Sequence, residues 1–155
     1  RTSAPTSVKR RGWPSLQRRS AGREAPLSAE ESPLNTLRRV SIDEVVAMLA
    51  AGAIYLDVRS DEEFEAGRPV GAINVPAEAL HFVARVEARL PDRSQTIVVA
   101  CEKGVRSFAA AHTLLEAGYA DVVEFRAGYA GRRDGFGRVL ERGWRDAGLP
   151  IEYDD

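Results

Sequence analysis

One cysteine has the clearest potential for covalent chemistry in this sequence. Cys101 is the only cysteine of the 155 residues, and it directly follows an apolar run, residues 96–100. Residues 102–107 then lead into an alanine-rich segment that is typical of a helix. A short loop that enters a helix can turn successive backbone N–H groups toward one point, and the helix adds the positive end of its dipole. Such a loop binds an anion, so we expect Cys101 to react as a thiolate.

The residues after Cys101 determine what the loop can bind. Gly104 permits tight curvature, and Lys103 and Arg106 add positive charge. Without these features, a cysteine after an apolar strand is more often an inert core residue. We expect substrate binding by the five loop residues Glu102, Lys103, Gly104, Val105 and Arg106. Supporting roles are expected for Ser107 and for Asp57 and Arg59, which follow an earlier strand and are expected to pair and fix a neighbouring loop.

The elements around Cys101 alternate between strands and helices. Apolar runs predict strands at 54–58, 72–75, 96–100 and 121–125. Ser-x-x-Glu capping boxes at 41–44 and 60–63 predict the starts of two helices, and further helices are predicted at 80–90, 107–118 and 136–147. Right-handed crossovers place such helices on both faces of a parallel sheet. The predicted fold class is therefore α/β with three layers, α/β/α, and Cys101 lies at the carboxyl edge of the sheet, where these folds bind ligands.

Charge divides the chain into two parts. Residues 1–39 carry 9 Lys or Arg against 3 Asp or Glu, whereas residues 40–155 carry 13 against 20. Residues 1–35 have almost no apolar periodicity, so we expect a disordered basic tail, followed by one domain at 36–155. The Arg- and Ser-rich tail is compatible with an organellar transit peptide, a nucleic-acid arm or a solvated extension.

Composition excludes several other classes of protein. No apolar run approaches the roughly 18 to 20 residues of a membrane-spanning helix, so no membrane partner is expected. A lone cysteine excludes an internal disulfide and favours a reducing compartment. We expect a cytoplasmic location, or an organellar one if the tail is a transit peptide. The sequence has no phosphate-binding glycine loop, dinucleotide fingerprint or spaced zinc ligands, so we expect no cofactor and no metal. A nucleic-acid partner is disfavoured.

Four ordered segments, between about residues 39 and 152, resemble the rhodanese family of sulfurtransferases. They are residues 56–59 with Glu63 and Phe64, residues 71–76, the loop at 98–107, and residues 115–119. The resemblance implies a three-layer rhodanese-like domain in which Cys101 accepts a sulfane sulfur as a persulfide, held by the amides of residues 102–106. It also implies a small donor, namely thiosulfate, a polysulfide or a persulfide, and a thiol, cyanide or protein acceptor. With no second cysteine, an external thiol or a partner protein must resolve the persulfide.

Two other functions stay open at this point. Phosphatases and arsenate reductases of related fold place an arginine six residues after the cysteine, where this chain has Ser107. Arg106 is five residues on, so we expect a narrower ring of amides that suits one sulfur atom better than a phosphate. The second alternative is a non-enzymatic rhodanese-like binding or regulatory module. Such modules normally lack the nucleophile, which this chain retains.

Two departures from the family pattern bear on the substrate. Glu63 stands where some thiosulfate-using members have an arginine, which weakens the case for thiosulfate. Residues 131–143 look like an insertion. One interpretation is a lid over Cys101 that uses Tyr129, Arg132, Arg133 and Phe136, and the other is a solvated loop with one extra helical turn.

Overall fold

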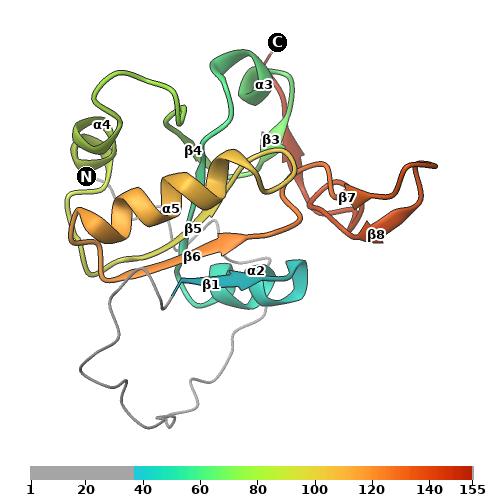
Figure 1. Cartoon of the computed structure of the whole chain (residues 1–155), viewed down its shortest axis with the longest axis horizontal. Coiled ribbons are helices and arrows are strands. Elements are labelled where there is room, and N and C mark those ends of the chain that lie inside the picture. The colour runs from blue at the N-terminus through green and yellow to red at the C-terminus, as the bar shows by residue number, and fades with distance from the viewer. Residues whose placement is uncertain (1–36, 155) are drawn as a thin grey trace, which may run out of the picture.

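The computed structural model describes residues 37–154, which form a central parallel sheet with helices on both faces (Figure 1). The sheet has five strands in the order β1-β6-β5-β2-β4. Their bounds are β1 Arg38–Val40, β2 Ile54–Asp57, β4 Ile73–Asn74, β5 Thr96–Ala100 and β6 Asp121–Phe125. The predicted three-layer α/β/α class is confirmed. The predicted tail, residues 1–35, lies outside the described residues.

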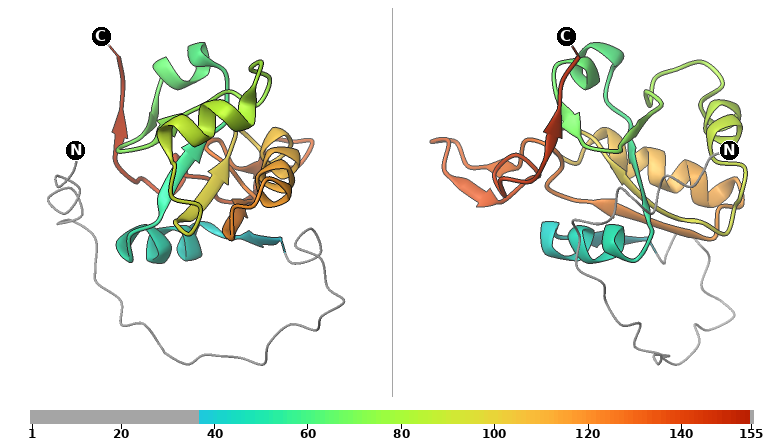
Figure 2. Two further views of the ribbon diagram at one scale, coloured as in Figure 1. Left: turned by 90° about the vertical axis from the view of Figure 1, so that its left-hand side faces the viewer. Right: turned by 180° about the vertical axis from the view of Figure 1, so that it is seen from behind.

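Four helices surround this sheet in the described part of the chain: α2 Ile42–Ala50, α3 Asp61–Glu65, α4 Phe82–Arg89 and α5 Arg106–Glu116. Helix α2 covers one face, and α4 and α5 cover the other (Figure 2). Successive side chains of a strand point to opposite faces. In β5, Ile97 and Val99 therefore pack with α4 and α5, whereas Val98 and Ala100 pack with α2. An uninterrupted apolar run is thus buried on both sides.

Both predicted capping boxes are present. The Glu44 amide donates to Ser41 Oγ at 3.3 Å, and the Ser41 amide donates to the Glu44 carboxylate at 2.9 Å. Ser60 and Glu63 make the same reciprocal bonds at 3.1 and 2.9 Å. These bonds satisfy amides that have no partner within the first helical turn, which explains why α2 and α3 begin where the sequence predicts.

The helix predicted at 136–147 is wrong. Strands β7 Arg132–Arg133 and β8 Val139–Glu141 form an antiparallel hairpin, which projects from the body of the molecule (Figures 1 and 2). The Asp134 carboxylate accepts from the amides of Phe136 and Arg138 at 2.8 and 2.9 Å, which fixes a tight turn. Local turn chemistry therefore prevails over the apolar spacing that indicated a helix.

The chain ends beside the first half of the domain. Strand β9, Ile151–Glu152, pairs antiparallel with β3, Arg68–Pro69. The segment before β9 buries Trp144 completely, with its ring at 5.5 Å, edge to face, from that of Tyr55. Among residues 37–154, no helix has the length and apolar character needed to cross a membrane.

Candidate active site

Cys101 lies at the carboxyl end of β5 with its side chain only 1% exposed. The amides of Gly104 and Ser107 donate to its Sγ at 3.2 and 3.4 Å, and Ser107 Oγ lies 3.2 Å from the same sulfur. Because α5 begins at Arg106, the positive end of its dipole adds to these contacts. Of the amides expected at 102–106, that of Gly104 contacts the sulfur, and the Ser107 amide, just beyond that range, does so as well.

Backbone contacts hold this loop against the rest of the domain. Gly104 has φ +88°, and a Cβ added there would collide with the carbonyl oxygen of Arg126. Tyr129 N donates to the Cys101 carbonyl and Ala130 N donates to the Glu102 carbonyl, both at 2.9 Å. The segment after β6 therefore supports the first residues of the loop from behind.

Arg106 is not a free cation. Its guanidinium donates to both carboxylate oxygens of Glu63, at 2.7 and 3.1 Å. These bonds lower the pKa of Glu63 from 4.5 to about 2 and raise the pKa of Arg106 above its ordinary value. Lys103 is exposed and forms no ion pair within the described part of the chain. The loop therefore presents one neutralised and one free positive charge.

Asp57 and Arg59 form the pair that the sequence predicts. Both are buried, and Arg59 Nη2 donates to Asp57 Oδ2 at 2.8 Å and to the Gly67 carbonyl at 2.8 Å. Burial acts to lower the pKa of Arg59, but the Asp57 carboxylate outweighs it and the pKa is raised. Arg59 Nη1 also reaches Glu102 at 3.3 Å, so the pair connects the loop after β2 to the cysteine loop.

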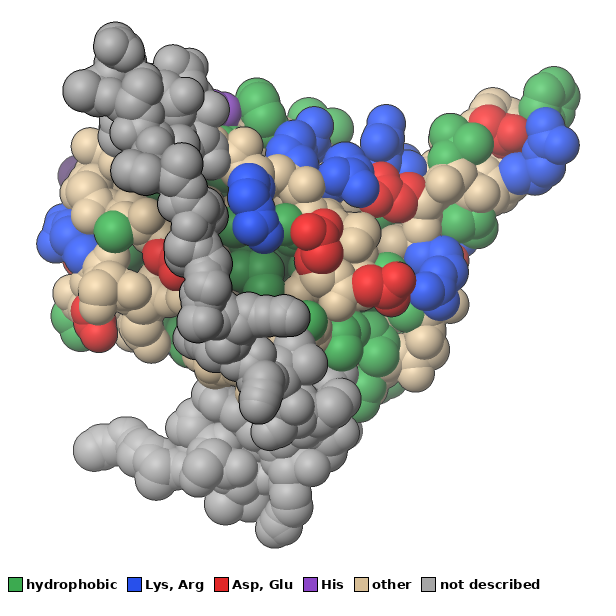
Figure 3. Space-filling view, turned by 90° about the horizontal axis from the view of Figure 1, so that it is seen from below, with side chains coloured by type: hydrophobic (Ala, Val, Ile, Leu, Met, Phe, Trp, Pro, Cys, Tyr) green, Lys and Arg blue, Asp and Glu red, His purple; other side chains and the backbone are tan. Residues whose placement is uncertain are grey.

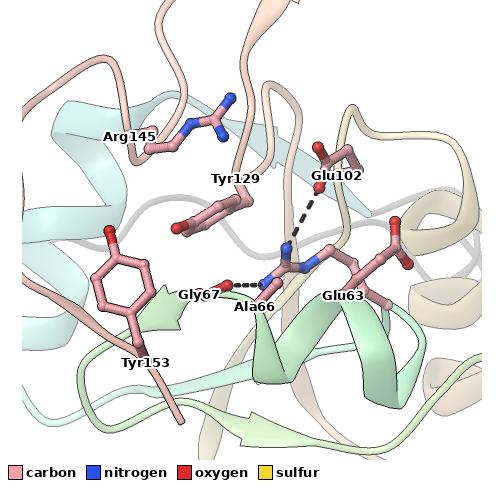
Figure 4. Close-up of a pocket in the computed structure, with 8 residues that line it drawn as sticks. Glu63, Ala66, Gly67, Glu102, Tyr129, Arg145 and Tyr153 are labelled. Carbon is pink, nitrogen blue, oxygen red and sulfur yellow. Dashed lines mark hydrogen bonds and ion pairs between the residues drawn. The ribbon is translucent and has the colours of Figure 1, made fainter. Parts of the chain in front are cut away.

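A pocket of about 230 Å³ opens beside the loop (Figure 4). Glu63 and Glu102 line it on the loop side, and Tyr129 lies between two guanidinium groups, with Arg59 at 4.3 Å and Arg145 at 5.4 Å from its ring centroid. The sequence analysis missed four of the residues that line it, because they come from segments without a recognisable motif: Ala66, Gly67, Arg145 and Tyr153.

The four residues that one interpretation assigns to a lid do not form a single group in the structure. Tyr129 is buried beside the loop, whereas Phe136 is 88% exposed at the turn of the projecting hairpin. Arg132 pairs with Glu141 at 3.6 Å and Arg133 with Asp146 at 2.5 Å, within the C-terminal segment. The solvated-loop interpretation fits these positions, with a two-stranded hairpin in place of a helical turn.

Two charged residues behind the loop were missed from the sequence. Glu124 of β6 is fully buried, and its carboxylate accepts from Ser107 Oγ and, at 2.6 Å, from Arg39 Nε. Arg39 Nη2 also donates to the Gly104 carbonyl at 2.9 Å. A glutamate inside an apolar strand is the signal that was available, because a buried charge needs a partner.

The site offers no recognisable place for a resident metal. Among residues 37–154, no three His, Cys, Asp or Glu side chains are grouped as metal ligands. The groups that contact Cys101 Sγ are two backbone amides and the Ser107 hydroxyl.

Comparison with known proteins places this geometry in a family. The family model described as the rhodanese-like domain matches residues 41–133. Thiosulfate sulfurtransferase 16, chloroplastic, from Arabidopsis thaliana is 34% identical over 133 residues, which cover 80% of this chain and 98% of that protein. Rhodanese-like domain-containing protein 15, chloroplastic, from the same plant is 32% identical over 66% of this chain, which spans only 54% of that relative.

Solved structures show the same fold. A thiosulfate sulfurtransferase from Pseudomonas aeruginosa is 30% identical with a TM-score of 0.58, over 77% of this chain and 21% of that one. Rv0390 from M. tuberculosis is 26% identical with a TM-score of 0.64, over 74% of this chain and 96% of that one. With its sheet order, cysteine loop and matched segment taken together, this chain belongs to the rhodanese-like domain family.

Proposed function

We propose that this chain is a sulfurtransferase that carries sulfane sulfur as a persulfide on Cys101. The observation that carries the proposal is the convergence of the Gly104 and Ser107 amides on Cys101 Sγ at the carboxyl edge of the sheet. Membership of the family and the sulfurtransferase names of several relatives support the same activity class.

The reaction has two displacement steps. The Cys101 thiolate attacks the outer sulfur of the donor, a new S–S bond forms, and the donor's own S–S bond breaks with its electron pair on the leaving group, which is sulfite when the donor is thiosulfate. A thiol or cyanide acceptor then attacks the terminal sulfur, and Cys101 leaves as a thiolate. The loop amides stabilise the negative charge on the terminal sulfur between the two steps.

Charge at the site bears on the choice of donor. Thiosulfate carries two negative charges, yet Glu63 neutralises Arg106 and a second carboxylate, Glu102, lines the pocket. Within the cysteine loop, Lys103 is left as the cation that attracts an anionic donor, and Arg145 lines the neighbouring pocket. This balance favours a donor with less charge at its reactive end, such as an organic persulfide, over thiosulfate, and an external thiol or a partner protein as acceptor.

We propose an organellar location for this protein. The two plant relatives named above are chloroplastic, which agrees with the transit-peptide interpretation of residues 1–35 rather than with a cytoplasmic location. On the described part of the face in Figure 3, acidic and basic side chains are interspersed. The described residues on that face form no continuous basic surface for a nucleic-acid backbone.

Intact-mass spectrometry after incubation with thiosulfate or glutathione persulfide tests the proposal. We expect the mass to increase by one sulfur atom, and we expect no increase in Cys101→Ser. Cyanide should remove the added sulfur and release thiocyanate. A chain that gains no sulfur from either donor but hydrolyses a small aryl phosphate would overturn the proposal in favour of the phosphatase alternative.

A further inference from the structure

The buried carboxylate of Glu124 lies one hydroxyl group away from the reactive sulfur. Ser107 Oγ contacts both Cys101 Sγ, at 3.2 Å, and the Glu124 carboxylate. Glu124 and Ser107 are fully buried and Cys101 is nearly so, which removes water as a competing partner. The three side chains come from a loop, a helix and a strand that follow one another in the chain, with sequence separations of 6 from Cys101 to Ser107 and 17 from Ser107 to Glu124.

The number of protons in this chain of contacts is limited. A serine hydroxyl has one proton to donate, and an ionised carboxylate can only accept. When Ser107 donates to Glu124, only a lone pair of its oxygen faces Cys101. The protonated thiol can donate to that lone pair, whereas a thiolate keeps the Gly104 and Ser107 amides as its donors. One arrangement of the protons therefore runs from Cys101 S–H to Ser107 O–H to Glu124.

This cluster contains two acidic groups, Cys101 and Glu124, and Arg39 supplies the positive charge beside them. Arg39 Nε donates to Glu124 at 2.6 Å, and its Nη2 donates to the Gly104 carbonyl in the cysteine loop at 2.9 Å. Loss of a proton from Cys101 to solvent would leave two buried negative charges against this single guanidinium, which is unfavourable in a site without water. Transfer of that proton to Glu124 keeps one negative charge against one positive charge.

We propose that Glu124 is a positioning residue that accepts the Cys101 proton through Ser107 and stores it while the persulfide exists; this rests on the proposed function. The S–H bond of Cys101 breaks and an O–H bond forms on Ser107 Oγ. The original O–H bond of Ser107 breaks, and its proton binds a Glu124 carboxylate oxygen. Ser107 then donates to the thiolate. When the acceptor removes the sulfur and the thiolate reappears, the same two transfers run in reverse.

Other charged groups around the cluster are already compensated. They form the ion pairs Arg126–Glu141, Arg106–Glu63 and Arg59–Asp57, and Glu102 joins the last of these. Lys103 is exposed on the loop. Tyr55, on β2 beside β5, stays neutral because burial raises its pKa well above the ordinary value. None of these groups contacts the Ser107 hydroxyl. Glu124 does contact it and is therefore the favoured acceptor of the proton.

The transfer predicts an unusual pH profile for alkylation. A proton that moves from Cys101 to Glu124 is neither released nor taken up, so the thiolate fraction produced in this way does not depend on pH. The rate of reaction of Cys101 with iodoacetamide should therefore level off over the pH range in which Cys101 and Glu124 together hold one proton. Since Cys101 is the only cysteine, intact mass reports this rate without interference.

Glu124→Gln is the decisive variant. Its amide can still accept from Arg39, but it cannot take a proton, and it donates to Ser107 so that the hydroxyl proton turns toward Cys101. We expect the level part of the profile to disappear, with the rate falling about tenfold per pH unit below the midpoint of thiolate formation. The midpoint itself should move down by about 1 to 2 pH units, because a nearby negative charge is lost. A damaged site would not make the thiol more acidic.

Ser107→Ala keeps the test valid if Glu124→Gln does not fold. It leaves Glu124 in place but interrupts the path, so the level part should again disappear, while the midpoint should rise because the thiolate loses its hydroxyl donor. Glu141→Gln is the matched control: it removes a partly buried carboxylate that pairs with Arg126 and does not contact Ser107, and it should retain the wild-type profile.

The outcomes separate this inference from the proposed function. A wild-type profile without the level part, or a level part that persists in Glu124→Gln or Ser107→Ala, overturns the role of Glu124. Alkylation needs no sulfur donor, so these results do not depend on persulfide formation. If the wild type gains sulfur but shows no level part, only the inference fails; if it shows the level part but gains no sulfur, only the proposed function fails.

Discussion

The ion pair between Glu63 and Arg106 is expected to weaken the binding of an anionic sulfur donor. The lowering of the Glu63 pKa from 4.5 to about 2 corresponds to about 3.4 kcal/mol if taken at face value. The Glu63 side chain is 35% exposed, however, and screening by solvent reduces the free energy of the ion pair to about 1 kcal/mol. Glu63→Gln frees Arg106 for the donor, so we expect KM for thiosulfate to fall about fivefold.

Steady-state sulfur transfer from thiosulfate to cyanide measures this change. Glutamine keeps the capping box, because its amide oxygen can accept from the Ser60 amide as Glu63 does at 2.9 Å. The gain should shrink at high salt, where screening weakens the attraction between Arg106 and the donor. Glu62→Gln is the control, since this exposed neighbour on α3 loses the same charge. An unchanged KM in Glu63→Gln, or an equal fall in the control, would refute the reasoning.

Four further results are expected. Because the pKa of Glu63 is lower in the folded than in the unfolded chain, its stabilising effect is complete above about pH 4.5 and is lost toward pH 2; urea unfolding should show a smaller acid-induced loss in Glu63→Gln. Lys103→Ala should raise KM for thiosulfate at low salt and less so at high salt. Gly104→Ala should lower kcat and the melting temperature, since its positive φ alone costs a side chain about 1 to 2 kcal/mol. Arg59→Met should cost about 3 to 5 kcal/mol in chemical denaturation, because it leaves the buried Asp57 carboxylate unpaired.

The parts of the fold that the sequence predicted are those with strong local signals. The buried strands have continuous apolar runs, and the capping boxes at Ser41 and Ser60 specify their helices within one turn. The cysteine loop was also predictable, since a strand, a glycine and a helix follow one another without a gap. Each of these signals is complete within about ten residues.

The parts that were missed depend on contacts between distant residues. Strand β1 has three residues and only Val40 is buried, so its sequence shows no alternation of apolar and polar residues that would predict a strand. Its partner β6 follows more than 80 residues later, and Arg39 and Glu124 meet only through that pairing. The segment wrongly predicted as a helix, 136–147, contains Val139 and Leu140, which are apolar but are 45% and 66% exposed in the structure. Periodicity cannot distinguish an apolar face that is buried from one that is left in solvent.

The depth of Cys101 restricts which oxidation products the protein can form. A disulfide between two copies requires their Cα atoms to approach within about 7 Å, yet Cys101 is only 1% exposed beneath its own loop. Two folded copies therefore cannot join through this residue. Small oxidants can still reach the sulfur and convert it to a sulfenic acid, which has no neighbouring cysteine in the chain with which to condense. Recovery from such oxidation thus requires a thiol from outside the chain that can reach Cys101, and the proposed function places the same requirement on the acceptor of the persulfide.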